Sequence, residues 1–148
     1  MKRIVWKLLS GIAVIGAWAI LIYGCISLNK QPSDDEIREL INGQWTEHDY
    51  FQGSEGSSEV NETRTYKPDG TLEGAGATGK IGTPGIRYCF SGTWKVQNGV
   101  LSEHLDKGDL AFVRRQNSND IVLHINSGSM QLRIPDSDST YWRHKAQK

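Results

Sequence analysis

The stretch Trp94-Lys95-Val96-Gln97-Asn98-Gly99-Val100-Leu101 decides the fold class of this chain. Asn-Gly favours a type I′ turn, in which both central residues take positive φ values. Trp94 and Val96 alternate with polar residues on the way into the turn, as they do in a strand with one buried face. The stretch therefore predicts two antiparallel strands joined by a tight hairpin.

Further turn signals follow on both sides of this hairpin. Pro68-Asp69-Gly70 is a second tight turn, and longer polar turns are predicted at 106–109, 117–120 and 126–129. Connections this short force neighbouring strands to be antiparallel, because a parallel crossover needs a dozen residues or more. The segments with period-two alternation predict a mainly β domain, a small barrel or sandwich. These segments are 44–51, 62–67, 71–73, 86–90, 92–96, 100–105, 110–115, 121–125, 130–134 and 140–143.

Alternation along these strands predicts an interior that is apolar and aromatic, with few charges. Leu110 and Phe112 would face inward, whereas Glu103, which shares the side of Leu101, is an exception. The aromatic side chains could line a pocket for a small apolar ligand. The alternative is that they fill the barrel, as side chains do in many small eight-stranded barrels. The candidate ligand-binding residues are Tyr66, Tyr88, Phe90, Trp94 and Phe112.

Two segments rich in glycine interrupt the strand pattern. The segment 52–59 contains Gly53 and Gly56, and the segment 74–85 has five glycines among its twelve residues. Glycine weakens strands because it has no side chain to pack. We expect both segments to be mobile loops at the open end of the fold.

A short helix precedes the first strand. Ser33 followed by Glu36 is a capping box, and the Asn42-Gly43 dipeptide is typical of a helix end. Ile37, Leu40 and Ile41 lie on one helical face. The helix is too short to persist without packing on the strands that follow.

The stretch Gly43-Gln44-Trp45 after this helix, at the start of an antiparallel meander, resembles the pattern of lipocalins. The resemblance covers roughly residues 33–145 and implies an up-and-down β-barrel whose closed end is plugged by Trp45. It also implies that an arginine of a late strand packs over the Trp45 ring. Arg143 is the first candidate for that arginine and Arg133 the second. The domain is similar to compact lipocalin-like domains of bacterial envelope lipoproteins.

The first thirty residues differ in composition from the rest. Lys2, Arg3 and Lys7 precede an uncharged segment, 8–29, that is long enough to cross a bilayer core of roughly 30 Å as a helix. Acidic residues follow from Asp34 onward, so the charge asymmetry predicts a cytoplasmic N-terminus and an exported remainder. The predicted division is an anchor at 1–30 and an exported domain at 31–148.

Three interpretations of the anchor stay open. The segment is an uncleaved transmembrane helix, a lipoprotein signal, or a removed secretory signal. Leu21-Ile22-Tyr23-Gly24-Cys25 resembles a bacterial lipobox, which implies that Cys25 is lipidated. In the first two cases the domain is held at the periplasmic or extracellular face of the inner membrane, or at the outer membrane if lipidated.

Several classes of function are not predicted. Seventeen basic residues balance seventeen acidic ones, which gives no footprint for nucleic-acid binding. His104, His124 and His144 are spaced by twenty residues, but His104 and His124 fall on the outward side of their strands, as solvent-facing residues do, and no metal site is predicted. The P-loop-like stretch 74–80 is followed by Ile81 where serine or threonine belongs. No nucleophile motif indicates an enzyme, no cofactor is predicted, and Cys89 is expected to be a partly buried single thiol.

Two functional hypotheses remain. The first is a membrane-anchored, lipocalin-like protein that binds a small apolar ligand at its open end. The second is a non-enzymatic envelope module or inhibitor that binds a protein, with a filled barrel core and a binding loop at 52–59 or 74–85. An empty, aromatic-lined interior favours the first hypothesis, and a packed interior favours the second.

Overall fold

A computed structural model describes residues 31–53, 56–113 and 115–146. The predicted anchor at 1–30, including Cys25, lies outside the described residues, so its three interpretations stay predictions. Within the described part, no helix combines the length and the apolar character that a membrane crossing needs.

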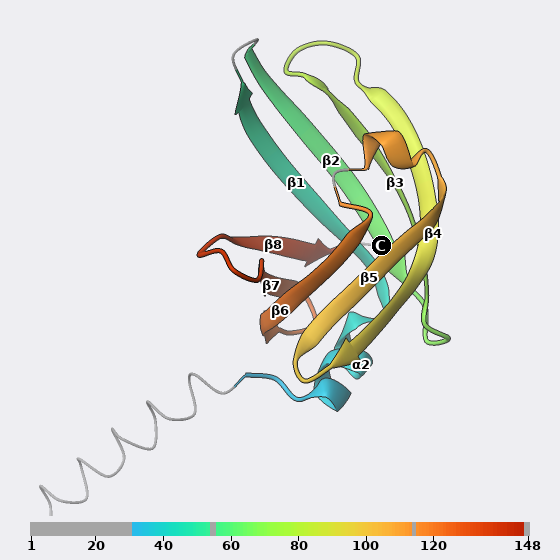
Figure 1. Cartoon of the computed structure of the whole chain (residues 1–148), viewed down its shortest axis with the longest axis vertical. Helices are drawn as coiled ribbons and strands as arrows, with labels where there is room; N and C mark the ends of the chain where they lie inside the picture. Colours follow the sequence, from blue (N-terminus) through green and yellow to red (C-terminus); the bar gives the residue numbers. More distant parts are fainter. Residues whose placement is uncertain (1–30, 54–55, 114, 147–148) are drawn as a thin grey trace, which may run out of the picture. The chain divides into compact units, whose positions relative to one another are not determined.

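The described residues form a closed antiparallel barrel of eight strands in sequence order, with one short α-helix before it (Figure 1). This confirms the prediction of a mainly β, up-and-down barrel, the architecture that lipocalins have. The helix α2 spans Asp34–Ile41, and a short 3₁₀ helix, η1, spans Leu110–Phe112. The strands are β1 (Gly43–Gly53), β2 (Gly56–Tyr66), β3 (Thr71–Lys80), β4 (Ile86–Gln97), β5 (Val100–Gly108), β6 (Asn117–Ile125), β7 (Ser129–Arg133) and β8 (Thr140–Lys145).

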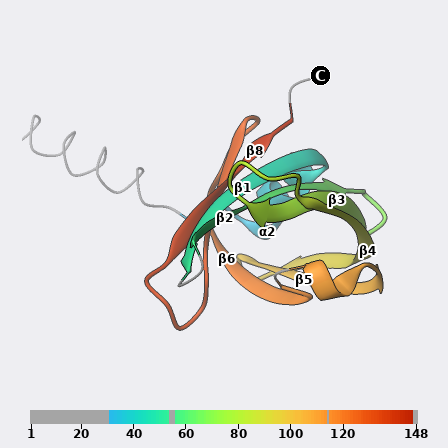
Figure 2. The same cartoon turned by 90° about the horizontal axis from the view of Figure 1, so that it is seen from above.

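The barrel wall is uneven in height. Strands β1 to β4 are long and continue upward in Figure 1 past the short strands β7 and β8. β1 pairs with β2 along its whole length, from Gly43↔Tyr66 to Gly53↔Gly56. It pairs with β8 only at Trp45↔Lys145 and Thr46↔His144. The barrel is therefore closed by a short β1–β8 seam near one end. Figure 2 shows the curved wall of β1 to β4 from above.

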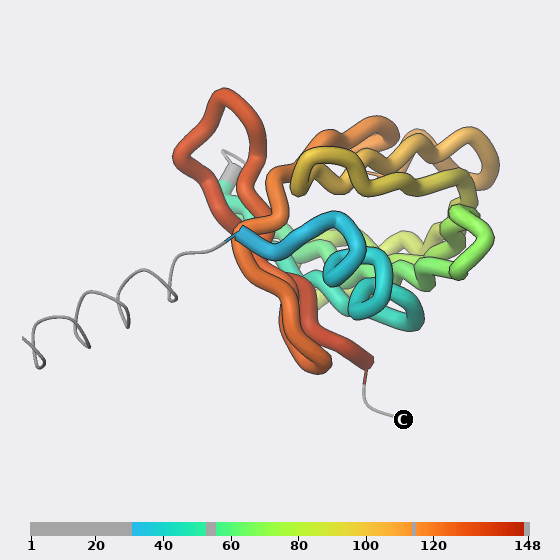
Figure 3. Tube along the Cα trace, turned by 90° about the horizontal axis from the view of Figure 1, so that it is seen from below, coloured from blue at the N-terminus to red at the C-terminus, as the bar shows by residue number. Residues whose placement is uncertain are grey.

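Helix α2 covers the closed end, as the view from below shows (Figure 3). The Ser33 hydroxyl accepts a hydrogen bond from the Glu36 amide at 3.3 Å, which confirms the predicted cap. The Asp34 carboxylate accepts hydrogen bonds from the amides of Asn98 and Gly99, at 2.9 and 2.7 Å. These two bonds tie the β4–β5 hairpin to the helix. Asn98 and Gly99 both have positive φ, as the predicted type I′ turn requires.

The prediction that 74–85 is a loop was wrong for its first half, because β3 continues to Lys80. Glycine is needed here by its neighbours. A Cβ at Gly74 would lie 2.4 Å from Cζ of Phe90, and one at Gly76 would lie 2.5 Å from Cζ of Tyr88. The missing side chains leave room for two aromatic rings from β4. Most of 52–59 is likewise strand, since β1 reaches Gly53 and β2 begins at Gly56.

Two other strand predictions need correction. Segments 86–90 and 92–96 are one strand, β4, with a register shift at Ser91/Gly92 where a Cβ on Gly92 would meet the His104 carbonyl oxygen at 2.0 Å. Segment 110–115 is not a strand, because the backbone bond from Phe112 to Asp109 turns it into η1. Phe112, expected to face inward, is largely exposed as a result.

The apolar core lies at the closed end. Ile37 and Ile41 of α2 pack there with Trp45 and with inward side chains from the surrounding strands. The buried apolar residues in this core include Leu72, Val96, Leu101, Val122, Met130 and Leu132. Higher in the barrel the interior changes from apolar to charged.

Candidate functional site

A group of charged and phenolic side chains fills the middle of the barrel. The expectation of an interior with few charges was therefore wrong. We call this group the ionic cluster, and it joins residues from β1, β2, β5, β6 and β8 with one residue from the segment after η1. Its members are Glu47, Glu62, Arg64, Tyr66, Glu103, Arg115, Asp120, Tyr141 and Arg143.

Glu103 is the centre of the cluster and is only 4 % exposed. Its Oε1 accepts a hydrogen bond from Arg143 Nη1 at 2.6 Å, and its Oε2 accepts one from Arg64 Nη1 at 2.7 Å. The hydroxyl of Tyr66 donates to Oε1, and the hydroxyl of Ser118 donates to Oε2 at 3.2 Å. One buried carboxylate thus holds four side chains from three other strands.

The two buried arginines have further partners. Arg143 Nε donates to Glu47 at 2.8 Å, and Arg143 Nη1 also donates to the Tyr66 hydroxyl oxygen. Arg64 forms an ion pair with Glu62, whose carboxylate accepts a hydrogen bond from Tyr88. Buried charges are stable only when they are paired and hydrogen-bonded, and this arrangement meets that condition.

A side branch of the cluster lies toward η1. Arg115 Nη2 lies 2.6 Å from both carboxylate oxygens of Asp120. The Tyr141 hydroxyl donates to Asp120 at 2.9 Å, and the Arg143 guanidinium lies over the Tyr141 ring, 5.5 Å from its centroid. This branch links β6 to β8, which pair with each other only through β7.

The cluster changes the ionisation of its members. Burial alone would raise the pKa of Glu103, but the charges of Arg143 and Arg64 outweigh burial and hold that pKa well below its usual range. Burial raises the pKa of Tyr66 well above its usual range, and it also raises the pKa of Tyr141. Near neutral pH the Glu103 carboxylate is therefore charged, and the phenols of Tyr66 and Tyr141 are neutral.

The ionic cluster leaves almost no free space. The cavity between Glu47, Glu62, Arg64 and Arg143 measures about 20 Å³. A water molecule needs on the order of 10–15 Å³ on the same kind of measure. The cavity therefore has room for about one water, which could bond to Arg64 Nε, a buried nitrogen without a protein partner among the described residues.

The five predicted ligand-binding aromatics do not line a common chamber. Tyr66 and Tyr88 are buried, and their hydroxyls bond to cluster carboxylates. Phe90 is buried beneath the Arg64 guanidinium, 5.0 Å from ring centroid to Cζ. Trp94 is partly buried, meets the Tyr66 ring edge to face at 5.7 Å and donates through Nε1 to the Lys67 carbonyl. Phe112, in η1, is 42 % exposed and stacks on Tyr88.

The structure places the two predicted plug residues, Trp45 and Arg143, in different surroundings. Trp45 is fully buried under α2 and donates through Nε1 to the Ile41 carbonyl at 2.6 Å. The cation over its ring is Lys145, with Nζ 4.4 Å from the ring centroid. Arg143, two residues earlier on the same face of β8, lies in the ionic cluster instead, and Arg133 is exposed. Lys145 and Arg143 lie at different heights along the barrel axis, and this decides which of them contacts Trp45. The Gly-x-Trp motif carries no information about that height.

Lys145 also closes the helix. Its ammonium donates to the carbonyl oxygens of Leu40 and Asn42 at the end of α2. Cations at a helix C-terminus are stabilised by the helix dipole. One side chain therefore joins the last strand to both the plug and the helix.

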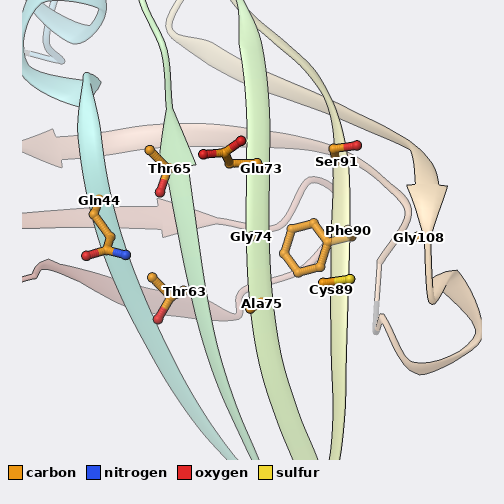
Figure 4. A pocket seen from close by; sticks show the side chains of 10 residues that line it. All are labelled: Gln44, Thr63, Thr65, Glu73, Gly74, Ala75, Cys89, Phe90, Ser91 and Gly108. Atoms are coloured by element: carbon orange, nitrogen blue, oxygen red, sulfur yellow. The ribbon is translucent and has the colours of Figure 1, made fainter.

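A concavity of about 630 Å³ lies on the outer wall of β1 to β4 (Figure 4). Its lining side chains, among them Thr63, Thr65, Ala75 and Ser91, alternate with the buried residues of the same strands. Cys89 lies on this wall and is exposed, so the expectation of a partly buried thiol was wrong. The described residues contain no group of three metal-ligating side chains close enough to hold an ion.

Four exposed apolar side chains come from the strand ends and the 3₁₀ helix of the taller part of the barrel. We define the rim as Tyr50, Ile81, Ile86 and Phe112, each at least two-fifths exposed. Ile81 donates its amide to the Ser57 carbonyl beside the β1–β2 turn, and Phe112 stacks on Tyr88 at 6.4 Å. The rim belongs to the part of the β1–β4 wall that extends beyond the ionic cluster, together with η1.

Comparisons with known proteins assign no family to this chain. No protein-family model matches the sequence, and no curated protein matches it significantly. The function must therefore be argued from the ionic cluster and the rim.

Proposed function

We propose that this chain is a non-enzymatic protein-interaction module of the bacterial cell envelope, in which a filled barrel supports a binding rim. The observation that carries the proposal is the 20 Å³ cavity inside the ionic cluster. A carrier of an apolar molecule needs an empty apolar chamber, typically of several hundred Å³. Here two arginines and several carboxylates occupy that space, and moving an apolar ligand among them would leave charges without partners.

The rim supplies the binding surface of the proposed module. Large apolar side chains on a monomer surface are unremarkable when scattered, but a group of them indicates an interaction site. Four of the five large hydrophobic residues that are exposed in the described part belong to the rim. An apolar ligand bound at the rim itself, rather than inside, is the second candidate, and the experiment below separates the two.

The rim lies at the end of the barrel away from the anchor segment's point of attachment. The described chain begins at Gln31, whose side-chain amide donates to the Gly99 carbonyl beside α2 at the closed end. A strand of ten residues spans roughly 33 Å, so the rim lies on the order of 30 Å from that point. We propose that residues 1–30 hold the module on the outer side of the membrane, as an uncleaved helix or through lipidated Cys25, and that the rim binds the partner.

Site-specific photocrosslinking in intact cells tests this function. A photoreactive benzoylphenylalanine at Phe112, 42 % exposed, should give a discrete protein adduct. The same group at Trp142, 43 % exposed on the barrel side, is the matched control and should not. Replacing Ile86, which lies two residues before the Phe112 neighbour Tyr88 on β4, with serine should remove the Phe112 adduct. Identical adducts from both positions, or no adduct from either, would contradict an interaction rim.

A dye titration tests the filled interior separately. N-phenyl-1-naphthylamine should show no saturable one-to-one binding to the purified full chain. Saturable binding that the Phe112→Ser change abolishes would favour the apolar ligand at the rim. Saturable binding that is unaffected by this change would place the ligand inside the barrel and overturn the proposal.

A further inference from the structure

The edge of β1 facing β8 carries backbone groups that no described strand pairs with. The Gln44 carbonyl accepts a hydrogen bond from the Ala146 amide on this side. In an antiparallel strand, alternate residues direct their N–H and C=O groups to the same neighbour. The backbone groups of His48 and Tyr50 therefore also face the β8 side, but the β1–β8 pairing ends at Thr46↔His144.

Where β8 separates from β1, a side-chain ion pair takes the place of the backbone hydrogen bonds between the two strands. The position opposite Glu47 would belong to Arg143, and Arg143 Nε instead donates to the Glu47 carboxylate at 2.8 Å. Beyond this ion pair β8 runs across β1 rather than along it (Figure 1). The other side of β1 is fully paired, up to Gly53↔Gly56 at its end. The upper half of β1 is thus an edge strand within a closed barrel.

The opposite boundary of the long wall is protected at the comparable point. β4 also extends beyond its partner β5, but both backbone groups of Cys89 are satisfied. The Asp109 amide donates to the Cys89 carbonyl at 2.8 Å, and the Asp109 carboxylate accepts from the Cys89 amide at 3.2 Å. Exposed edges are usually blocked by lysine, proline or a bulge. At the β1 edge His48 and Tyr50 provide none of these, and the inward-pointing charge of Glu47, another device that can protect an edge, is neutralised by Arg143.

We propose that an extended segment of the partner protein adds to the β1 edge as a further strand, pairing with the backbone of His48 and Tyr50. Main-chain hydrogen bonds provide the affinity in this mode of recognition, and alternate side chains provide specificity. The inference rests on the proposed interaction function and names the form in which the partner binds.

The charges beside the edge define the partner segment as basic. Glu47 lies on the inner face of β1, with 18 % of its side chain exposed, and Glu59 lies on the outer face of β2, directly opposite Tyr50. His48 contacts Glu59 at 3.4 Å. An added strand places one row of side chains near Glu47 and the other near Glu59. Glu47 is already paired with Arg143 and Glu59 with His48, so lysine or arginine in alternate positions gives each carboxylate a second cationic partner, whereas a second copy of this edge would bring like carboxylates together.

The test uses the full chain in lipid nanodiscs and a fluorescent alternating Lys-Val peptide as the probe. We expect saturable binding of this probe, and no binding of an alternating Glu-Val peptide. A Lys-Val probe N-methylated at consecutive residues has both of its edges blocked, so it cannot pair with the β1 edge and should bind at least about fivefold more weakly. Equal binding of the plain and N-methylated probes would overturn the proposal, as would failure of the Lys-Val probe to bind.

Two variants of β1 add an independent arm. Tyr50→Pro removes an N–H that faces the free edge, and edge strands tolerate proline there. Tyr50→Ala removes the same side chain and keeps the N–H. The proline variant should lose at least about fivefold more probe affinity than the alanine variant. If the proline variant does not fold, the N-methylated probe on the unchanged chain still decides.

Failure of this inference is distinguishable from failure of the proposed function. If the Phe112 photocrosslink forms while the Lys-Val probe does not bind, the module binds its partner without strand addition, and only the present proposal falls. If hydrogen exchange of the β1 amides slows when the probe binds, strand addition is supported directly. Exchange that slows only in other strands would overturn it.

Discussion

Glu103 on β5 and Arg143 on β8 form an ion pair across the centre of the barrel, with 2.6 Å between Glu103 Oε1 and Arg143 Nη1. The two strands are not neighbours in the sheet, so the pair spans the interior. Both side chains are at least nine-tenths buried. A buried ion pair contributes little net stability compared with apolar packing, but loss of one partner is costly. The pair therefore makes the barrel interior intolerant of single changes.

Glu103→Gln should destabilise the domain strongly. The change leaves the charges of Arg64 and Arg143 buried without their shared carboxylate, at a cost of about 3–5 kcal/mol. Urea denaturation followed by circular dichroism measures the loss. Glu73→Gln, which removes only the exposed pair with Lys67, is the control and should change stability by about 0.5 kcal/mol or less. Similar effects of the two changes would show that the ionic cluster is not tightly coupled.

Acid should weaken the domain through the same carboxylate. The pKa of Glu103 is lowered in the folded state from its ordinary value of 4.5. The unfolded chain therefore binds a proton that the folded chain does not, so stability is present above about pH 4.5 and falls as the pH drops below it. Urea midpoints measured between about pH 3 and pH 7 should fall less steeply for Glu103→Gln than for the unchanged chain. Parallel curves would contradict this assignment.

Gly76→Ala should destabilise the barrel although alanine usually suits a strand better. The added Cβ would lie 2.5 Å from Tyr88 Cζ, which forces the ring to move at a cost of about 1–3 kcal/mol. Gly128→Ala is the control, because its nearest contact is an ordinary 3.7 Å. Tyr88→Leu should offset part of the Gly76→Ala penalty in a double-mutant cycle. Additive effects of the two changes would exclude the clash as the cause.

Lys145→Met should weaken the closed end of the barrel. Methionine keeps most of the apolar stem but loses the cation over Trp45 and the hydrogen bonds to the end of α2, about 1–2 kcal/mol together. Thermal unfolding measures the change. Lys107→Met removes an exposed lysine of β5 and should be close to neutral. A neutral Lys145→Met would show that Trp45 is held by packing alone.

Metabolic labelling with a palmitate analogue distinguishes the three interpretations of the anchor. If Cys25 is lipidated, the chain should carry the label and Cys25→Ala should lose it, whereas Cys89→Ala should keep it. An unlabelled chain that stays in the membrane fraction would establish the uncleaved helix. An unlabelled chain released into the soluble fraction would contradict membrane anchoring as proposed.

The strands that turn chemistry specifies could be predicted from the sequence. Asn98-Gly99 and Pro68-Asp69-Gly70 are local signals, and the hairpins they predict are present. The glycine-rich strand β3 could not be recognised, because its glycines are required by the rings of Tyr88 and Phe90 on the next strand, which leave no room for a Cβ. Contacts between strands depend on which residues are paired across the sheet, and the amino-acid composition of one strand does not reveal that pairing.

The ionic cluster could have been found in part. Arg64 and Glu62 share the side of Tyr66 on their strand, as Glu103 shares the side of Leu101, and inward charges of both signs indicate a buried network. The exchange of roles between Arg143 and Lys145 could not be predicted. Both point inward from β8, and only their heights in the barrel decide which of them meets Trp45.

The seam between β1 and β8 has a consequence for how the barrel is made. Trp45 and Lys145 lie near opposite ends of the described chain. The contact between them, the bonds of Lys145 to the end of α2 and the β1–β8 seam can therefore form only after β8 has been made. Contacts so distant in sequence are slow to form, because a long loop must be ordered before they give any stability. Synthesis delivers β1 first and β8 last, and until β8 arrives the early strands form an open sheet with an uncovered apolar end. A chain truncated before Lys145 would remain in that unfinished state, and its exposed strands would be a natural substrate for chaperones and proteases.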